Sequence, residues 1–172
     1  MQSESAIPDF YYYCFAIYEP LLTLLGFVGT QLDPKNVHDA QAPWVNSSPS
    51  TELPRATLVT LFQLANVCAL LGVVNFFVLS AARKHLHHDL FLQEKVVSSL
   101  MTPLLIGDIS HMYMTLWGLG DQRWNFSSWT PMLWTTFILG LTLMIPRVAW
   151  HIGVGRYVHQ LHRRAEDRGK NR

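Results

Sequence analysis

The run Leu104-Leu-Ile-Gly-Asp-Ile-Ser-His-Met-Tyr-Met114 places an acid and an imidazole, Asp108 and His111, inside an apolar segment. The two residues are three positions apart, which puts them on the same side of a helix. An ionisable side chain at the middle of a membrane costs roughly 2.5–3.5 kcal/mol on insertion scales, so such groups face the interior of a bundle. The run therefore predicts a polar centre inside a small membrane protein.

The composition agrees with a membrane protein of one domain. The chain has 172 residues, and only 15% of them are charged, against about 25% in soluble domains. A net charge of +1 gives no indication of a nucleic-acid partner. Cys14 and Cys68 both lie in apolar runs, and we interpret them as small buried hydrophobic side chains.

Four apolar runs are long enough to cross a hydrocarbon core of about 30 Å as helices. The predicted spans are residues 10–29, 57–79, 96–117 and 131–152. The predicted fold class is therefore an all-α integral membrane four-helix bundle. Residues 1–9 form an N-terminal tail without Lys or Arg, so the first run is expected to be a retained span and not a signal peptide. We expect a long polar loop at 30–56, a basic loop or amphipathic connector at 80–95, and a basic tail at 153–172.

The distribution of charges predicts the topology. Lys and Arg gather in residues 80–95 and in the C-terminal tail, which places both termini in the cytosol. Glycosylation sequons begin at Asn46 and Asn125, both in loops assigned to the opposite side. The ending Arg168-Gly-Lys-Asn-Arg172 is similar to a basic retrieval tail, so we expect a multi-pass protein of the endoplasmic reticulum. The predicted aromatic belt consists of Trp117, Trp124, Trp129 and Trp134.

Polar residues in two other spans are predicted to lie at a depth similar to that of Asp108. At 1.5 Å per residue, Glu19, Asp108 and Asn66 fall about 13, about 18 and about 20 Å from the cytosolic ends of their spans. A neutral acid beside a hydrogen-bonded Asp–His pair would form a proton-transfer site. The candidate catalytic residues are Asp108, His111 and Glu19, and the candidate substrate-binding residues are Asn66, Gln63 and Tyr113.

The same polar groups also have structural interpretations. Amide side chains hold membrane helices together at about 0.6 kcal/mol per bond, and this is the favoured role for Gln63, Asn66 and Asn75. We interpret Arg147, near the end of the fourth span, as an interfacial anchor that extends its charge to the headgroups, with Asn75 within its reach.

The acids keep both interpretations open. Asp108 and His111 form either a functional pair or a bond within the bundle, and Glu19 either acts in the site or bonds the backbone freed by Pro20. The sequence contains no phosphate-binding loop, dinucleotide fingerprint or metal-ligand motif, so we infer no cofactor and no metal.

Several motifs resemble a fungal family of four-span membrane proteins of unknown function. Tyr12-x-x-Phe15-x-x-x-Glu19-Pro20 opens the match, Leu64-Ala-Asn-Val67 continues it, and Leu105-Ile-Gly-Asp-Ile-Ser-His-Met-Tyr113 is its sharpest part. The resemblance covers about residues 8–152. Many members have an Asn-Glu pair late in the second span where this chain has Val74-Asn75, so one acid of that pattern is absent.

More distantly, four spans with internal acids and a histidine are similar to the emopamil-binding-protein group of sterol isomerases and sigma-type ligand receptors. This similarity implies a lipophilic substrate that enters from the membrane and an acid that protonates an alkene. Our first hypothesis is an isomerase or cyclase of a terpenoid-like or sterol-like molecule, as in fungal specialised metabolism. The alternative is a non-enzymatic lipid or sterol binder or an accessory subunit, and a transporter ranks third because four spans without a repeat are few.

The expected partners follow from these hypotheses. They are membrane lipids and one hydrophobic small molecule, and the sequence assigns no oligomeric state.

Overall fold

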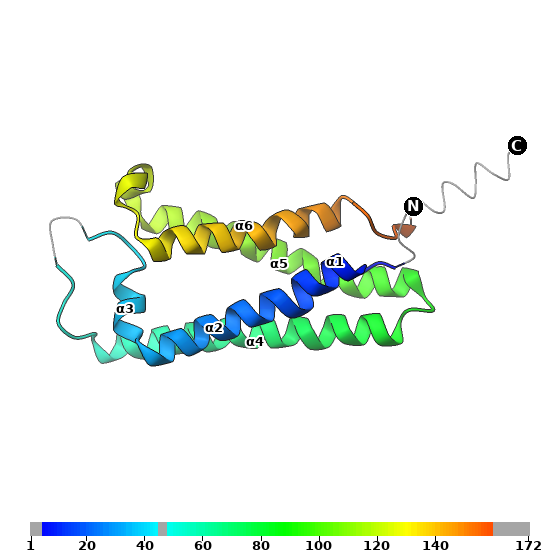
Figure 1. Cartoon of the computed structure of the whole chain (residues 1–172), viewed down its shortest axis with the longest axis horizontal. Helices are drawn as coiled ribbons and strands as arrows, with labels where there is room; N and C mark the ends of the chain where they lie inside the picture. Colours follow the sequence, from blue (N-terminus) through cyan, green and yellow to red (C-terminus); the bar gives the residue numbers. More distant parts are fainter. Residues whose placement is uncertain (1–4, 45–47, 160–172) are drawn as a thin grey trace, which may run out of the picture.

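The computed structural model describes residues 5–44 and 48–159, and all regular structure in them is helical. The predicted all-α fold is confirmed for this part of the chain. Long helical segments lie side by side along the length of the molecule (Figure 1). The first is made of α1 (Asp9–Tyr12), the π-helical segment η1 (Tyr13–Tyr18) and α2 (Glu19–Leu32), and the others are α4 (Arg55–His85), α5 (Leu90–Gly118) and α6 (Pro131–His151).

Short helices occupy two of the connections. The helix α3 (Pro34–Asp39) lies in the predicted loop between the first two spans, and Asp33 caps it by accepting a hydrogen bond from the Asn36 amide at 3.1 Å. A hydrogen bond from Lys35, and to a lesser extent one from His38, holds the pKa of the Asp39 carboxyl below its usual value. The helices η2 (Gly120–Trp124) and η3 (Phe126–Ser128) connect α5 to α6.

The region predicted as a basic connector is mostly helical. α4 continues to His85 and α5 begins at Leu90, so only a short turn joins them. Asp89 caps α5 by accepting a hydrogen bond from the Leu92 amide at 2.9 Å. Hydropathy places this segment outside the bilayer, but a polar segment can still continue a helix, and here it does.

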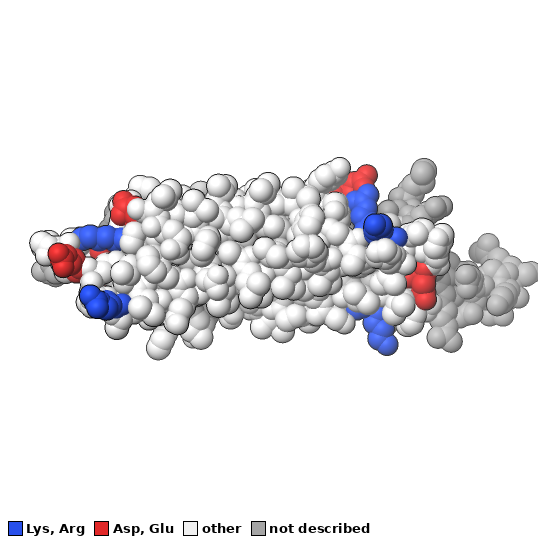
Figure 2. All heavy atoms as spheres, turned by 90° about the horizontal axis from the view of Figure 1, so that it is seen from below, with Lys and Arg blue, Asp and Glu red and all other residues white. Residues whose placement is uncertain are grey.

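Three helical segments are long and apolar enough to cross a membrane: Asp9–Leu32, Arg55–His85 and Pro131–His151. They indicate a membrane protein. Figure 2 shows that Lys, Arg, Asp and Glu gather near the two ends of the visible face and leave an uncharged band between them. With 29 residues, α5 is long enough to span, but it is not among the three. Its polar members, which include Asp108 and His111, lower its mean hydropathy.

The hydrophobic core lies near the end of the molecule that holds residue 5 and the last turn of α6, which we call the termini end. The opposite end, with α3 and η2, is the loop end (Figure 1). Buried side chains from all long segments meet in this core: Ile7, Tyr11, Phe15, Ala16, Leu79, Ala82, Val97, Met101 and Trp150.

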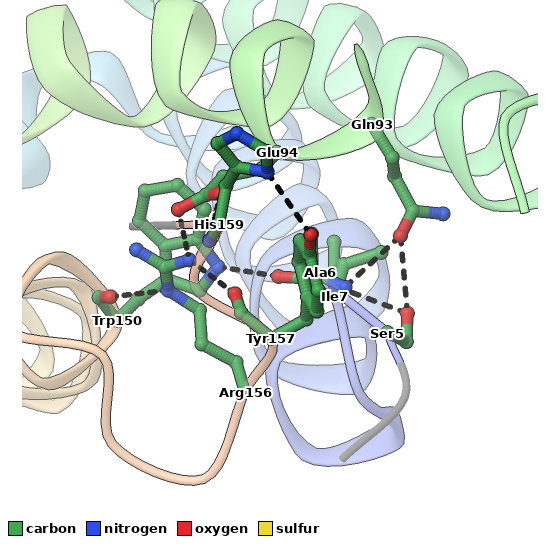
Figure 3. Close-up of polar contacts among 9 residues, drawn as sticks. All are labelled: Ser5, Ala6, Ile7, Gln93, Glu94, Trp150, Arg156, Tyr157 and His159. Carbon is green, nitrogen blue, oxygen red and sulfur yellow. Dashed lines mark hydrogen bonds and ion pairs between the residues drawn. The ribbon is translucent and has the colours of Figure 1, made fainter. Parts of the chain in front are cut away.

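Polar contacts fasten the N-terminal segment across the termini end (Figure 3). The Gln93 Oε1 atom accepts a hydrogen bond from the Ala6 amide at 3.0 Å, and Trp150 Nε1 donates to the Ala6 carbonyl at 2.8 Å. Arg156 donates to the Trp150 carbonyl at 2.6 Å and to Glu94 at 2.7 Å. Residues 5–8 and the chain after α6 therefore cover this end of the bundle.

Toward the loop end, α4 and α5 diverge. Near the termini end they are joined by a hydrogen bond from Gln93 Nε2 to the Ala82 carbonyl at 3.2 Å. Leu64 lies about five turns before Ala82 on the same face of α4, and His111 about five turns after Gln93 on the same face of α5. Leu64 is 60% exposed and His111 is also exposed. The facing sides of α4 and α5 are thus in contact near the termini end and separated near the loop end.

Gly72 allows α2 and α4 to pack closely, as small residues do between membrane helices. A Cβ atom on Gly72 would lie 3.0 Å from the Pro20 Cα atom and would overlap the Thr23 hydroxyl. We expect Gly72→Ala to lower the free energy of unfolding by about 1–3 kcal/mol, measured as a lower Tm in detergent. Gly26→Ala is the matched control, because no atom lies within 4 Å of its added Cβ. Equal Tm values for the two variants would contradict the close approach.

Candidate active site

Two carboxylates from different helices meet at one buried guanidinium. Arg147 Nη2 lies 2.5 Å from Glu19 Oε2, and Arg147 Nη1 donates a hydrogen bond to Asp108 Oδ2. The side chain of Arg147 is 0% exposed, that of Glu19 9% and that of Asp108 18%. The structure therefore brings two of the predicted catalytic residues together through Arg147. We call these three side chains the Arg147 centre.

The local sequence around Glu19 explains how this carboxylate is placed. Pro20 has no backbone N–H, and its ring conflicts with the carbonyl four residues earlier in a regular α-helix. The preceding residues, Tyr13–Tyr18, form a π-helical segment, a rare conformation that is frequent at functional sites. Phe15 in this segment lies beneath the guanidinium, with its ring centroid 5.0 Å from Arg147 Cζ. The π-helical segment thus supplies both the direction of Glu19 and an aromatic face for Arg147.

The other two members of the centre are placed by α5 and α6. Asp108 follows Met101 by seven residues, about two turns, so it lies on the core-facing side of α5. The Arg147 carbonyl accepts a hydrogen bond from His151 Nδ1 at 2.8 Å, and His151 Nε2 lies 3.3 Å from the Thr102 hydroxyl of α5. This bridge holds the two helices together one turn from the Arg147 centre.

Unused hydrogen-bonding capacity remains around the centre. Asn75 of α4 is 1% exposed and lies beside Glu19, yet neither its Nδ2 nor its Oδ1 makes a hydrogen bond of regular geometry within residues 5–44 and 48–159. Arg147 Nε is likewise buried without a partner in that part of the chain. Such groups cost free energy unless a ligand or water satisfies them. Two ionised carboxylates against one guanidinium also leave a net negative charge, which a proton or a cation would neutralise.

The structure corrects two predictions about charged residues. The expected anchoring of Arg147 at the interface is wrong, because its side chain is fully buried between two acids and makes no hydrogen bond to Asn75. The expected Asp108–His111 hydrogen bond is absent, since the only bond that the described residues make to the Asp108 carboxylate comes from Arg147. His111 is exposed, although it lies near enough to Asp108 to interact electrostatically.

The predicted substrate-binding residues do not join the centre. Asn66 lies nine residues before Asn75, about two and a half turns, so it is on the opposite side of α4. Gln63 and Asn66 are exposed, and Tyr113 is 62% exposed. The convergence predicted for Asn66 is therefore not found, and Asn75 takes the place beside Glu19.

The structure also places the remaining sequence features. Asn125 is exposed in the connection between α5 and α6, and its Oδ1 accepts a hydrogen bond from the Ser127 hydroxyl at 2.8 Å. Asn46 and the retrieval-like ending lie outside the described residues. Cys68 is exposed, so its interpretation as a buried hydrophobic residue is wrong, and Cys14 is only half-buried.

The described pockets lie away from the centre. None of the four is lined by Glu19, Asp108 or Arg147. One of about 330 Å³ at the loop end is lined by aromatic residues of the predicted belt, including Trp129 and Trp134, whose ring centroids are 5.0 Å apart. Among the described residues, no three His, Cys, Asp or Glu side chains are grouped to hold a metal ion.

These features define a helical membrane protein with an ion-paired centre between its helices. The chain belongs to the family described as a domain of unknown function, DUF7704, whose sequence model matches residues 4–157. No curated protein and no solved structure matches the chain.

Proposed function

We propose that the protein is an integral membrane isomerase or cyclase that acts on a hydrophobic, terpenoid-like or sterol-like molecule at the Arg147 centre. In this proposal α5 is the fourth span, both termini are cytosolic, and the membrane is that of the endoplasmic reticulum. The observation that carries the proposal is the sharing of one guanidinium by two carboxylates, Glu19 and Asp108. One carboxyl balances Arg147, and the second is then available to hold and transfer a proton.

The proposed reaction uses this second carboxyl as the acid. Asp108 is the better candidate, because its side chain is the more exposed of the two. Transfer of its proton to an alkene carbon creates a carbocation and leaves the centre with one net negative charge, which stabilises that cation. Loss of a proton from a neighbouring carbon to Asp108 completes an isomerisation. Attack by a second double bond before that loss completes a cyclisation.

Access to the centre follows from the divergence of α4 and α5. The exposed face of α5 at the loop end carries His111, one turn beyond Asp108, where it is placed to return a proton to the carboxylate. Asn75 lies on the other side of the centre, and its buried amide makes no hydrogen bond of regular geometry within the described chain, which suits it to orient a polar group of the substrate.

A non-enzymatic role is the second candidate. None of the four pockets described above is lined by the centre, and binding at a surface between helices needs no enclosed cavity there. A lipid, sterol or amphiphile that carries a permanent positive charge would satisfy the same negative charge without any chemistry. An accessory subunit of a membrane complex would use the centre to hold helices together.

The substitution Asp108→Asn tests the enzymatic proposal. It leaves the Glu19–Arg147 ion pair intact, so the protein level should stay unchanged while product formation falls by about 10²–10⁴-fold. The measurement is mass spectrometry of hydrophobic metabolites from cells that express the wild type, the variant or neither. Ser110→Ala is the control, because Ser110 is exposed on α5 and, within the described part of the chain, its hydroxyl bonds only the Gly107 carbonyl of its own helix. A wild-type product that persists with Asp108→Asn at equal protein level would contradict the mechanism.

A further inference from the structure

A row of residues runs along α4 with the spacing of a coiled-coil seam, and all of them are exposed except Val73, which is half-buried. Positions 59, 63, 66, 70, 73 and 77 are separated alternately by four and three residues, the repeat by which two helices pack side by side. Val59 is 49% exposed, Leu70 58% and Phe77 65%, and Gln63 and Asn66 are also exposed. We call Val59, Gln63, Asn66, Leu70, Val73 and Phe77 the α4 seam.

The α4 seam faces away from the rest of the bundle. Gly72 marks the side of α4 that contacts α2, and Ala82 marks the side that contacts α5. Gln63 lies nine residues before Gly72, about two and a half turns, and is therefore opposite to α2. Asn66 is likewise about half a turn from Asn75, which faces the interior. Figure 2, viewed from the side on which α4 lies in Figure 1, shows no charged residue in the middle of this face.

Two amides on this face lack partners at the depth of the membrane interior. Asn66 stands about 16 Å from the start of α4 and lies near the middle of the predicted span at residues 57–79. Several hydroxyl side chains bond a carbonyl of their own helix, as Thr60 does by donating to the Ala56 carbonyl at 3.0 Å. Gln63 and Asn66 make no hydrogen bond to any residue in the described part of the chain. Hydrocarbon offers no donor or acceptor, so an amide in this position requires another protein helix.

We propose that the α4 seam is the interface of a homodimer in which two copies of α4 run parallel and Asn66 bonds Asn66 of the second copy. An amide carries both a donor and an acceptor, so it is complementary to itself. A twofold axis along the membrane normal places equivalent residues of the two copies at the same depth, so symmetry alone brings the two Asn66 side chains to one level. A polar residue in a seam of otherwise apolar positions also fixes the register of the pair.

The dimer and the proposed chemistry are independent of each other. The α4 seam lies on the opposite side of α4 from Asn75 and the Arg147 centre, so neither surface occupies the other. The two proposals therefore fail separately: a change in oligomeric state would not require a change in product, and loss of product would not require dissociation.

Cysteine cross-linking in membranes tests the interface. In a chain with Cys14→Ser and Cys68→Ser, the variant Asn66→Cys should form a disulfide-linked dimer on mild oxidation. Leu64→Cys is the matched control, because Leu64 is 60% exposed at nearly the same depth but lies on the face of α4 that points toward α5. It should cross-link several-fold less. Equal cross-linking of both variants, no dimer with either, or a cross-link from position 66 to a different protein would overturn the proposal.

A second measurement does not depend on cysteine chemistry. Subunit counting of the purified full chain in lipid nanodiscs at graded protein-to-lipid ratios should show a dimer for the wild type. Asn66→Leu keeps the helix apolar and should raise the dissociation constant by about tenfold. A wild-type chain that stays monomeric at every ratio, or an Asn66→Leu variant that dimerises as well as the wild type, would contradict the pairing of amides.

Discussion

Arg147→Met is expected to lower the free energy of unfolding by about 3–5 kcal/mol, because it leaves Glu19 and Asp108 without their shared counterion. Both carboxylates are mostly buried, and removal of one partner from a buried ion pair leaves an uncompensated charge. Methionine keeps much of the length of the arginine side chain, so the loss is electrostatic more than steric. The effect is measured as a fall in Tm in detergent and in the yield of folded protein.

Two further variants separate this explanation from general damage to α6. The triple substitution Glu19→Gln, Asp108→Asn and Arg147→Met removes all three charges and should recover most of the lost stability, as replacement of whole buried ion pairs often does. Arg55→Met removes an exposed arginine at the start of α4 and should change the free energy of unfolding by less than about 0.5 kcal/mol. A triple variant no more stable than Arg147→Met alone would show that the arginine acts through packing.

The helices could be predicted from the sequence because hydropathy and chain-breaking residues are local properties. The apolar runs locate the four long segments, and Thr130 with Pro131 marks the start of α6. The predicted spans are shorter than α4 and α5 where these two helices approach each other in the sequence. A span predicted from hydropathy stops where the chain becomes polar. The helices continue past that point, to His85 in α4 and from Leu90 in α5.

The site could be predicted only in part, because depth along a helix does not give direction around it. The sequence predicts that the acids Glu19 and Asp108 lie at similar depth. It also predicts Asn66 beside them, although Asn66 points away, and the nine-residue spacing from Asn75 is the signal that separates the two amides. The position of Arg147, one turn from the end of α6, favours an interfacial role that the structure does not bear out. The burial of Arg147 depends on Glu19 and Phe15 of the first helical segment and Asp108 of α5 packing around the guanidinium, which is a tertiary property that no local pattern contains. Two acidic side chains within the spans nevertheless indicate that a positively charged side chain is buried beside them.

Trp150→Ala should lower the free energy of unfolding by about 3–5 kcal/mol, the usual cost of removing a large buried aromatic side chain. Trp150 is 1% exposed, and its indole contacts the N-terminal segment, since Nε1 donates to the Ala6 carbonyl at 2.8 Å. Arg156 stacks on the ring, with its Cζ 4.0 Å from the centroid.

The loss of Trp150 should also disturb the Arg147 centre, because Trp150 lies one turn beyond Arg147 and belongs to the same buried core as Phe15, whose ring packs against the guanidinium. Trp150→Phe keeps an apolar ring and removes only the bond to Ala6, so it should cost about 1 kcal/mol. Trp117→Ala is the control, because Trp117 is 68% exposed on α5 and its removal leaves no cavity. In Trp150→Ala, hydrogen exchange of the Ala6 and Ile7 amides should accelerate more than hydrogen exchange of the amides within the helices. Uniform acceleration across the chain would mean that the N-terminal segment is not a separate cover and that the whole bundle depends on this one ring.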